Sequence, residues 1–267
     1  MINTQRIPGL CAGLLVVTGA VQAEDRLLLV EREQLLATDP TETLLGQRIW
    51  DMHRTALSRT SLVRLQDESP AVQHAVGERT LIILEGSVDF SFANGNKTLS
   101  AGDYVAIAPN QPYQMKPAAG SSPLLLGFDV PIIDMQQAQP KDVSTGAGDN
   151  APEIKRQQAV MASPPGWDDP SDRGWTLAKT PEKRVNLVEM LSELKNHSHP
   201  DADHSLILLK GSARVVTPDE ERVLNPGDYV SIPQNVPHKY YVDGDQPALF
   251  ISFDAPAYDP AKTIFFE

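Results

Sequence analysis

The sequence predicts an all-β protein that consists of two tandem units of similar sequence. Residues 81–131 align without a gap on residues 206–256, an offset of 125, and 17 of the 51 aligned positions are identical. Short β-branched and aliphatic runs such as SLILLKGSARVVT alternate with Gly and Pro turns such as NPGDYVSIP, whereas helical periodicity is confined to segments such as REQLLATD. Two copies are too few for a solenoid, so these patterns indicate two packed antiparallel sandwiches or barrels.

The first 23 residues have the layout of a cleavable signal peptide. MINTQR supplies one basic side chain, IPGLCAGLLVVTGAV is apolar or small throughout, and VQA places small residues before a cut at Glu24. The alternative is an uncleaved N-terminal anchor. The one cysteine, Cys11, leaves with this segment, so the mature chain has no disulfide and no thiolate ligand. We expect a periplasmic or secreted protein.

The repeat also sets the expected domain boundaries. Arg48 and Trp50 align with Arg173 and Trp175 at the same offset, so the repeat extends upstream of residue 81 in the first unit and of residue 206 in the second. The polar, Gly-containing stretch PKDVSTGAGDNAP has the composition of a linker. We therefore expect a first unit over 24–139, a linker over 140–152 and a second unit over 153–267.

The charge of the chain limits its partners. A formal net charge of −12, with no Lys/Arg cluster, offers no electrostatic footprint for nucleic acid or for anionic lipid. The expected partner is a small molecule, with no nucleic acid and no membrane after signal cleavage. A homodimer is a further possibility.

Half of the six histidines lie in the eight-residue stretch HSHPDADH. His197 and His199 point to the same face if they lie on one strand, because side chains alternate along a strand. The PDAD turn then places His204 at the start of the next strand, and His238 is expected to arrive from a separate strand across the barrel. Four neutral imidazoles that converge in this way can bind a divalent first-row metal.

These residues resemble the two motifs of the cupin family. His197, His199, His204 and Gly211 match the spacing of the first motif, and Pro226-Gly227-Asp228, Pro233 and His238 match the second. The resemblance implies a jelly-roll barrel for each unit, hence a bicupin, and a metal held by His197, His199, His204 and His238. His204 stands where most metal-binding cupins have glutamate. Asp203 is the alternative ligand at this corner, and Asp201 and Asp203 are expected to accept hydrogen bonds from the imidazoles.

The first unit departs from this pattern. The positions equivalent to the four histidines are Val72, His74, Arg79 and Tyr113, so a single imidazole remains. One ligand cannot hold a metal. We expect a degenerate, metal-free first barrel that supports the second, with His74 as a packed or surface remnant.

The resemblance implies a metal-dependent enzyme, and the signal sequence implies that it is exported. A metal held by four neutral histidines keeps a charge of +2, which favours a small, anionic substrate. A non-haem dioxygenase-type reaction is the first expectation, with Fe²⁺ or Mn²⁺ as the metal and Zn²⁺, Ni²⁺ or Cu²⁺ as further options. The alternatives are a non-redox lyase, isomerase or decarboxylase, or a non-catalytic metal- or ligand-binding protein. Tyr240, two residues after His238, is the candidate acid or base. Glu189, Glu193 and Lys195 share the parity of His197 and lie either inside the barrel or on its rim.

Overall fold

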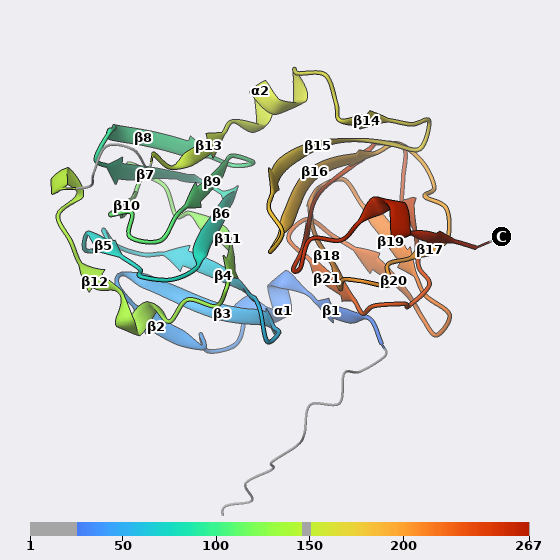
Figure 1. Ribbon diagram of the computed structural model, residues 1–267, viewed down its shortest axis with the longest axis horizontal. Coiled ribbons are helices and arrows are strands. Elements are labelled where there is room, and N and C mark those ends of the chain that lie inside the picture. The colour runs from blue at the N-terminus through green and yellow to red at the C-terminus, as the bar shows by residue number, and fades with distance from the viewer. Residues whose placement is uncertain (1–25, 146–150, 267) are drawn as a thin grey trace, which may run out of the picture.

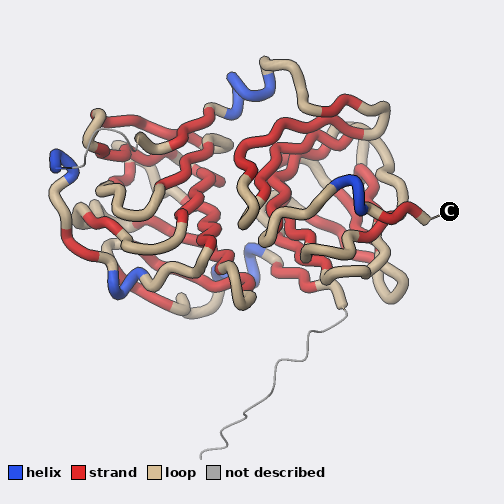
Figure 2. Tube along the Cα trace, in the orientation of Figure 1, coloured by secondary structure: helices blue, strands red, loops and turns tan. Residues whose placement is uncertain are grey.

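The computed structural model describes residues 26–145 and 151–266, and it contains two β-barrels that lie side by side (Figure 1). Nearly all regular structure is strand, and the helices are single short turns (Figure 2). The all-β, two-barrel prediction is therefore confirmed. The expected signal peptide, 1–23, and its cleavage site lie outside the described residues. None of the helices in the described ranges has the length and apolar character that a membrane span requires.

The first barrel is formed mainly by one large and one small antiparallel sheet. The large sheet has, in spatial order, β13 (Glu153–Lys155), β9 (Tyr104–Ile107), β6 (Glu78–Glu85), β11 (Leu124–Val130), β4 (Arg59–Leu65), β3 (Gln47–Arg54) and β2 (Glu42–Leu44). The small sheet has β10 (Gln114–Pro117), β7 (Ser87–Phe92) and β8 (Gly95–Ser100), and β5 (Val72–Gln73) pairs with β12 (Gln139–Pro140).

The second barrel repeats this arrangement. Its large sheet has β1 (Leu28–Val30), β21 (Tyr229–Ile232), β18 (His204–Lys210), β23 (Ala248–Asp254), β16 (Arg184–Met190), β15 (Asp172–Lys179) and β14 (Trp167–Asp168). Its small sheet has β20 (Glu221–Leu224), β19 (Ala213–Val216) and β22 (Lys239–Val242), and β17 (His197–Ser198) pairs with β24 (Ile264–Phe265). Short helices, α1 (Arg32–Leu36), α2 (Gln157–Met161) and three 3₁₀ turns (Met135–Gln137, Val143–Thr145, Pro260–Lys262), connect the strands.

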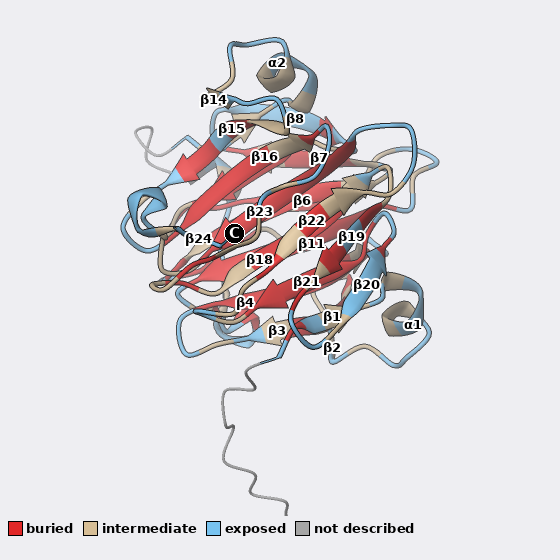
Figure 3. Cartoon of the chain, turned by 90° about the vertical axis from the view of Figure 1, so that its right-hand side faces the viewer, coloured by how far each residue is buried: buried red, intermediate tan, exposed pale blue. Residues whose placement is uncertain are grey.

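The central strands of each large sheet are buried on both faces, which explains their continuous apolar sequences. Every residue of β11 and of β23 is buried, and Figure 3 shows these strands among the most buried parts of the molecule. Along β6, Leu81 and Ile83 belong to the core inside the first barrel, whereas Ile82 between them belongs to the core shared with the second barrel. A strand buried on both sides loses the polar alternation of a half-exposed one. One face of each sheet is therefore a barrel interior and the other is the interface between the units.

The two units exchange their first strands. β1 pairs antiparallel with β21 of the second barrel, and β13, which lies 125 residues later, pairs with β9 of the first barrel. Each exchanged strand runs into a short helix that is held by an aspartate of the other unit. Asp228 Oδ1 accepts from the backbone N–H of Arg32 at 2.9 Å, and Asp103 Oδ1 accepts from that of Gln157 at 3.1 Å. Neither barrel is complete without the other half of the chain.

Aromatic and polar contacts close the interface between the barrels. Phe128 and Phe253, equivalent residues of the repeat, meet with ring centroids 4.8 Å apart. Lys183 is 2 % exposed, and its Nζ donates to Thr80 Oγ1 at 2.6 Å while pairing with Glu78. A buried lysine is tolerated where its charge and donors are partnered in this way. These contacts place one barrel in a defined orientation on the other.

Candidate metal centre

The strand pairing of the second barrel brings two of the predicted ligands together. His197 and His238 form an antiparallel bridge, with N–H···O distances of 2.9 Å and 2.8 Å in the two directions. His238 therefore lies on a neighbouring segment paired with His197, not across the barrel as the sequence suggested. His199 follows β17 directly, and its ring centroid lies 5.0 Å from that of His197 and 5.4 Å from that of His238.

These three histidines form a group that is able to hold a metal ion. The nearest available nitrogens of His197, His199 and His238 all lie within 4.8 Å of one another. A tetrahedral or octahedral metal with bonds of about 2.0–2.2 Å spaces its ligand atoms by roughly 3 Å, so a small convergence of the rings would complete the site. His199 and His238 are buried, whereas His197 is partly exposed at the mouth.

His204 lies beside this group at the first position of β18. Its ring centroid is 4.8 Å from His199 and 5.7 Å from His238. Its Nδ1 donates to Asp254 Oδ1 at 2.9 Å, which leaves Nε2 as the nitrogen that faces away from the carboxylate. An imidazole oriented by a carboxylate is the usual arrangement of a metal-binding histidine.

The hydrogen bonds of the rings fit a metal. The Nδ1–H groups of His197 and His238 donate to the carbonyls of Lys195 and Val236 at 2.7 Å and 2.9 Å. This fixes the tautomer, so each Nε2 carries a lone pair. His238 Nε2 and both nitrogens of His199 are buried without a hydrogen-bond partner among the described residues. Buried nitrogens left unpaired are costly, and a cation at the centre of the group would accept the lone pairs of His238 Nε2 and of one nitrogen of His199.

Burial keeps these imidazoles neutral. Desolvation is the main cause that lowers the pKa of His197, His199 and His238, and repulsion from neighbouring imidazoles lowers it further. A metal ligand must be an unprotonated imidazole. The cluster is therefore ready to bind a cation at neutral pH.

Two tyrosines lie against the cluster. The predicted Tyr240 is 2 % exposed, its ring centroid is 5.6 Å from His238 and 6.5 Å from His204, and burial raises its pKa well above 10. Tyr258, which sequence reasoning missed, lies with its ring centroid 4.6 Å from His199, and burial raises its pKa to about 12. Both phenols are therefore protonated at neutral pH, and either can donate a proton or a hydrogen bond.

The expected roles of two aspartates are wrong. Asp203 Oδ1 accepts from the backbone N–H of Gln234 at 3.1 Å, and Asp201 Oδ2 accepts from Asp259 N and Lys262 Nζ, each at 3.2 Å. Neither takes an imidazole N–H of the cluster. Two backbone carbonyls and Asp254 do so instead, because the strands bring these groups behind the rings.

The charged residues that share the parity of His197 lie outside the cluster. Glu193 and Lys195 are exposed, and Glu193 pairs with Lys239 at 3.3 Å. Glu189 pairs with Arg173. β16 ends at Met190, so the alternation does not continue unbroken to His197. The rim alternative is correct for Glu193 and Lys195.

The first barrel keeps the geometry of the site with only one of the four imidazoles. Val72 and Tyr113 form the same isolated bridge as His197 and His238. His74 is 2 % exposed, and its Nδ1 contacts Val76 O at 3.0 Å. Arg79 Nε lies 3.9 Å from Asp129 Oδ1, in the place of the pair formed by His204 and Asp254. His74 is thus a packed residue.

Two repeated jelly-roll barrels, one with an interior histidine cluster, define the class of the protein: its architecture is that of a bicupin. The Cupin domain family model matches residues 187–254, which contain His197, His199, His204 and His238. A search of curated proteins gave no match.

Solved structures show the same fold over both barrels. A Cupin 2 conserved barrel domain protein from Leptotrichia buccalis superposes with a TM-score of 0.61 at 15 % identity, covering 85 % of this chain and 95 % of that one. An oxalate decarboxylase from Bacillus subtilis, studied for its Mn(II) centres, gives 0.59 at 13 % identity, with 83 % and 75 % covered. A variant salicylate 1,2-dioxygenase from Pseudoaminobacter salicylatoxidans in complex with gentisate gives 0.69 at 12 % identity, with 88 % and 83 % covered.

Proposed function

We propose that the protein is a metal-dependent bicupin enzyme that acts on a small anionic molecule in its second barrel. One observation carries this proposal: His197, His199 and His238 converge in that barrel, and buried nitrogens of His199 and His238 have no hydrogen-bond partner among the described residues. His204, oriented by Asp254, is proposed as the fourth ligand. Neutral ligands leave a bound divalent ion with its full charge, which favours an anionic substrate.

A dioxygenase-type reaction is the first candidate. When bound there, Fe²⁺ or Mn²⁺ would supply a Lewis acid and a one-electron redox centre. The all-nitrogen ligand set suits these metals, and Zn²⁺, Ni²⁺ and Cu²⁺ can bind imidazole as well. The likeness to a dioxygenase crystallised with gentisate supports this candidate at the level of the fold.

A non-redox decarboxylase, lyase or isomerase is the second candidate, and Tyr240 favours it. The phenol is buried, its oxygen has no hydrogen-bond partner among the described residues, and its pKa is raised well above 10. A protonated acid beside the cluster is what a carbanionic intermediate would need. The likeness to oxalate decarboxylases is consistent with it.

The test combines metal analysis with two product measurements. Purified protein is loaded separately with Fe²⁺, Mn²⁺ and Zn²⁺, and its metal content is determined by elemental analysis. Each preparation is then assayed against a panel of small carboxylic acids. Oxygen uptake identifies the dioxygenase, and carbon dioxide release without oxygen uptake identifies the decarboxylase. Tyr240→Phe should abolish the second reaction at unchanged metal content. Stoichiometric metal with turnover of no acid would contradict the enzyme and favour a binding protein.

We also propose that the protein is exported with cleavage before Glu24. The support is the sequence pattern of residues 1–23. The mass of the protein recovered from the periplasm or the medium checks it, and retention of residues 1–23 would contradict it.

A further inference from the structure

A buried arginine stands at the same position of both barrels, in two different environments. Arg59 is the first residue of β4 and Arg184, 125 residues later, is the first residue of β16. They are 2 % and 8 % exposed. A guanidinium does not lose its proton in a protein, so each barrel contains a buried positive charge that needs a partner.

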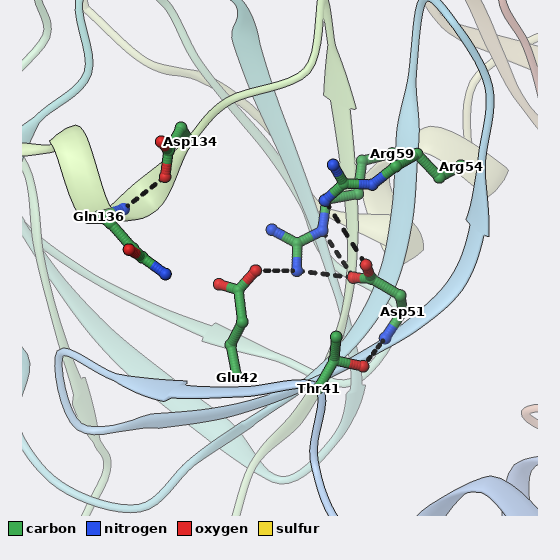
Figure 4. Close-up of polar contacts among 7 residues, drawn as sticks. All are labelled: Thr41, Glu42, Asp51, Arg54, Arg59, Asp134 and Gln136. Atoms are coloured by element: carbon green, nitrogen blue, oxygen red, sulfur yellow. Dashed lines mark hydrogen bonds and ion pairs between the residues drawn. The ribbon is translucent and has the colours of Figure 1, made fainter. Parts of the chain in front are cut away.

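In the first barrel this charge is neutralised within the chain. Arg59 lies between two carboxylates, which Figure 4 shows on either side of the guanidinium. Its nitrogens lie 2.6 Å from Asp51 Oδ1 and 3.0 Å from Glu42 Oε1. Two acidic partners saturate the guanidinium, which leaves no net positive charge for a ligand.

In the second barrel both carboxylates have been replaced. The positions equivalent to Glu42 and Asp51 are Trp167 and Thr176, an indole and a hydroxyl. The guanidinium carbon of Arg184 lies 5.9 Å from the ring centroid of Trp167, and Thr176 Oγ1 donates to Asn186 instead. The repeat therefore provides an internal comparison: the same arginine is kept while its counter-ions are removed.

The remaining contacts of Arg184 do not satisfy it. Its Nε donates to Asn186 Oδ1 at 3.3 Å, and its Nη1 is buried without a hydrogen-bond partner in the described part of the chain. Asp254 interacts electrostatically with Arg184, but Asp254 Oδ1 already accepts from His204 at 2.9 Å. A buried donor with no acceptor costs free energy, which a bound anion would recover.

Arg184 also lies next to the histidine cluster. Its guanidinium stacks on Tyr258, 4.8 Å from the ring centroid, and the same ring lies 4.6 Å from His199 and 6.2 Å from His204. The equivalent of Tyr258 in the first barrel is Ile133, so this polar platform is specific to the second barrel. The charge of Arg184 is close enough to help lower the pKa of His199.

We propose that Arg184 is a specificity-determining residue that binds a carboxylate group of the ligand beside the histidine cluster, with Tyr258 holding the guanidinium in place. The proposal rests on the proposed function and names the substrate class: a small carboxylate. A guanidinium presents two parallel N–H groups that match a carboxylate. Among the described residues Arg184 Nη1 has no hydrogen-bond partner, and the carboxylates that pair with Arg59 in the first barrel have no counterpart, so this fork is available to a ligand.

The test is a calorimetric titration of the full-length protein with oxalate and acetate, and with oxamide and acetamide as neutral counterparts. Titrations are run on metal-loaded and on metal-free protein, with metal content measured for every variant. In Arg184→Gln, we expect metal-loaded protein to keep its metal and to bind the carboxylates about ten- to a hundredfold more weakly, because charge-assisted hydrogen bonds to the ligand are lost. Arg59→Gln, the same substitution at the repeated position, should leave carboxylate affinity unchanged.

A second variant keeps the arginine and restores its counter-ion. Thr176→Asp places a carboxylate where the first barrel has Asp51, and it should weaken carboxylate binding as Arg184→Gln does, with the metal retained. Unchanged carboxylate affinity in Arg184→Gln or in Thr176→Asp, or amides that bind as tightly as carboxylates, would overturn the proposal. Failure of the wild type to bind metal would instead overturn the proposed function. Weakened anion binding to metal-free Arg184→Gln relative to metal-free wild type would still support the arginine site.

Discussion

His199 differs from its neighbours in the cluster because neither of its ring nitrogens has a hydrogen-bond partner in the described residues. His197 and His238 each use one nitrogen on a backbone carbonyl. A buried ring with two unpaired nitrogens has no structural purpose of its own, so its environment is best explained by a ligand.

Replacement of His199 or His238 by alanine should reduce bound metal to background. Each change removes one of the four proposed imidazole ligands, and the three that remain bind a divalent ion far more weakly. Elemental analysis after dialysis measures the effect, with circular dichroism to verify the fold. His74→Ala is the matched control in the first barrel and should keep the full metal content. Equal loss of metal in His74→Ala would show that the first barrel contributes to binding.

Asp254→Asn should lower metal affinity about ten- to a hundredfold. The carboxylate accepts from His204 Nδ1 and thereby orients the ring and increases the basicity of Nε2. Competition with a chelator of known affinity measures the change. Asp129→Asn, the equivalent substitution beside Arg79, should leave metal affinity unaltered, and an undiminished affinity in Asp254→Asn would remove His204 from the ligand set.

His74 should make the stability of the metal-free protein sensitive to mild acid. Burial lowers its pKa in the folded state to about 4, against about 6.5 in the unfolded chain. The unfolded state thus binds more protons between these values, so stability is at its full value above pH 6.5 and falls as the pH drops toward 4. In His74→Gln, the decrease in the free energy of unfolding between pH 7 and pH 4 should be smaller by up to about 3 kcal/mol. Urea unfolding at a series of pH values measures this difference. Parallel profiles for the variant and the parent would contradict the assignment.

At the scale of elements, the exchanged strands depend on close approaches at two turn glycines. Gly227, with φ +93°, lies just before Asp228, and a Cβ added there would meet Arg32 Cδ at 2.3 Å. Gly102, with φ +88°, holds the same place beside Gln157 in the other barrel. The helix that follows each exchanged strand therefore packs directly on a glycine of the partner unit.

Gly227→Ala should destabilise the protein by about 1–3 kcal/mol, through backbone strain at positive φ and displacement of Arg32. It should also make residues 26–36 more sensitive to limited proteolysis, because Arg32 would lose its pairing with Glu85. Gly244→Ala is the control, since Gly244 has φ +123° but no atom within 4 Å of an added Cβ. Equal proteolysis of the two variants would mean that the contact with Arg32 does not hold the exchanged segment.

Much of this arrangement could be predicted from the sequence, and the exceptions have physical causes. The repeat, the strands and the motif around His197 and His199 depend on local patterns, which the amino-acid order displays. Asp254 is repeated in the first unit as Asp129, so a comparison of the two units does not mark it as specific to the site. Arg184 and Tyr258 reach the cluster only through the pairing of distant strands. The sequence signal that could have pointed to Arg184 is the replacement of Glu42 and Asp51, the partners of Arg59, by Trp167 and Thr176 in the second unit.

The strand exchange also could not be read from the sequence. The segments 28–30 and 153–155 correspond in the repeat, but nothing local distinguishes a strand that completes its own sheet from one that completes the neighbouring sheet. That choice depends on the geometry between the barrels.

At the scale of the whole molecule, one apolar core joins the two barrels. It contains buried residues from both large sheets, with Phe128 and Phe253 in contact near its middle. A shared core of this kind makes the stability of each barrel depend on the other, so the chain should unfold as one cooperative unit.

Phe253→Ala should cost about 3–5 kcal/mol, the usual effect of removing a buried phenylalanine side chain, and should lower the melting temperature of the entire molecule. Phe128→Ala should have a similar effect from the other side of the contact. Scanning calorimetry is expected to show a single transition in both variants. Two resolved transitions, with one barrel unaffected, would contradict the coupling of the barrels.

The reciprocal exchange of β1 and β13 has a consequence for inheritance. A gene fragment that encodes either half alone would specify a barrel whose large sheet ends at β9 or β21. The backbone groups of that edge strand would be unpaired, and such an edge can pair with strands of other chains and cause aggregation. Selection for solubility would therefore retain the first half even if it bound no metal. A first half without metal ligands would therefore still be needed to pair the edge strand of the second barrel.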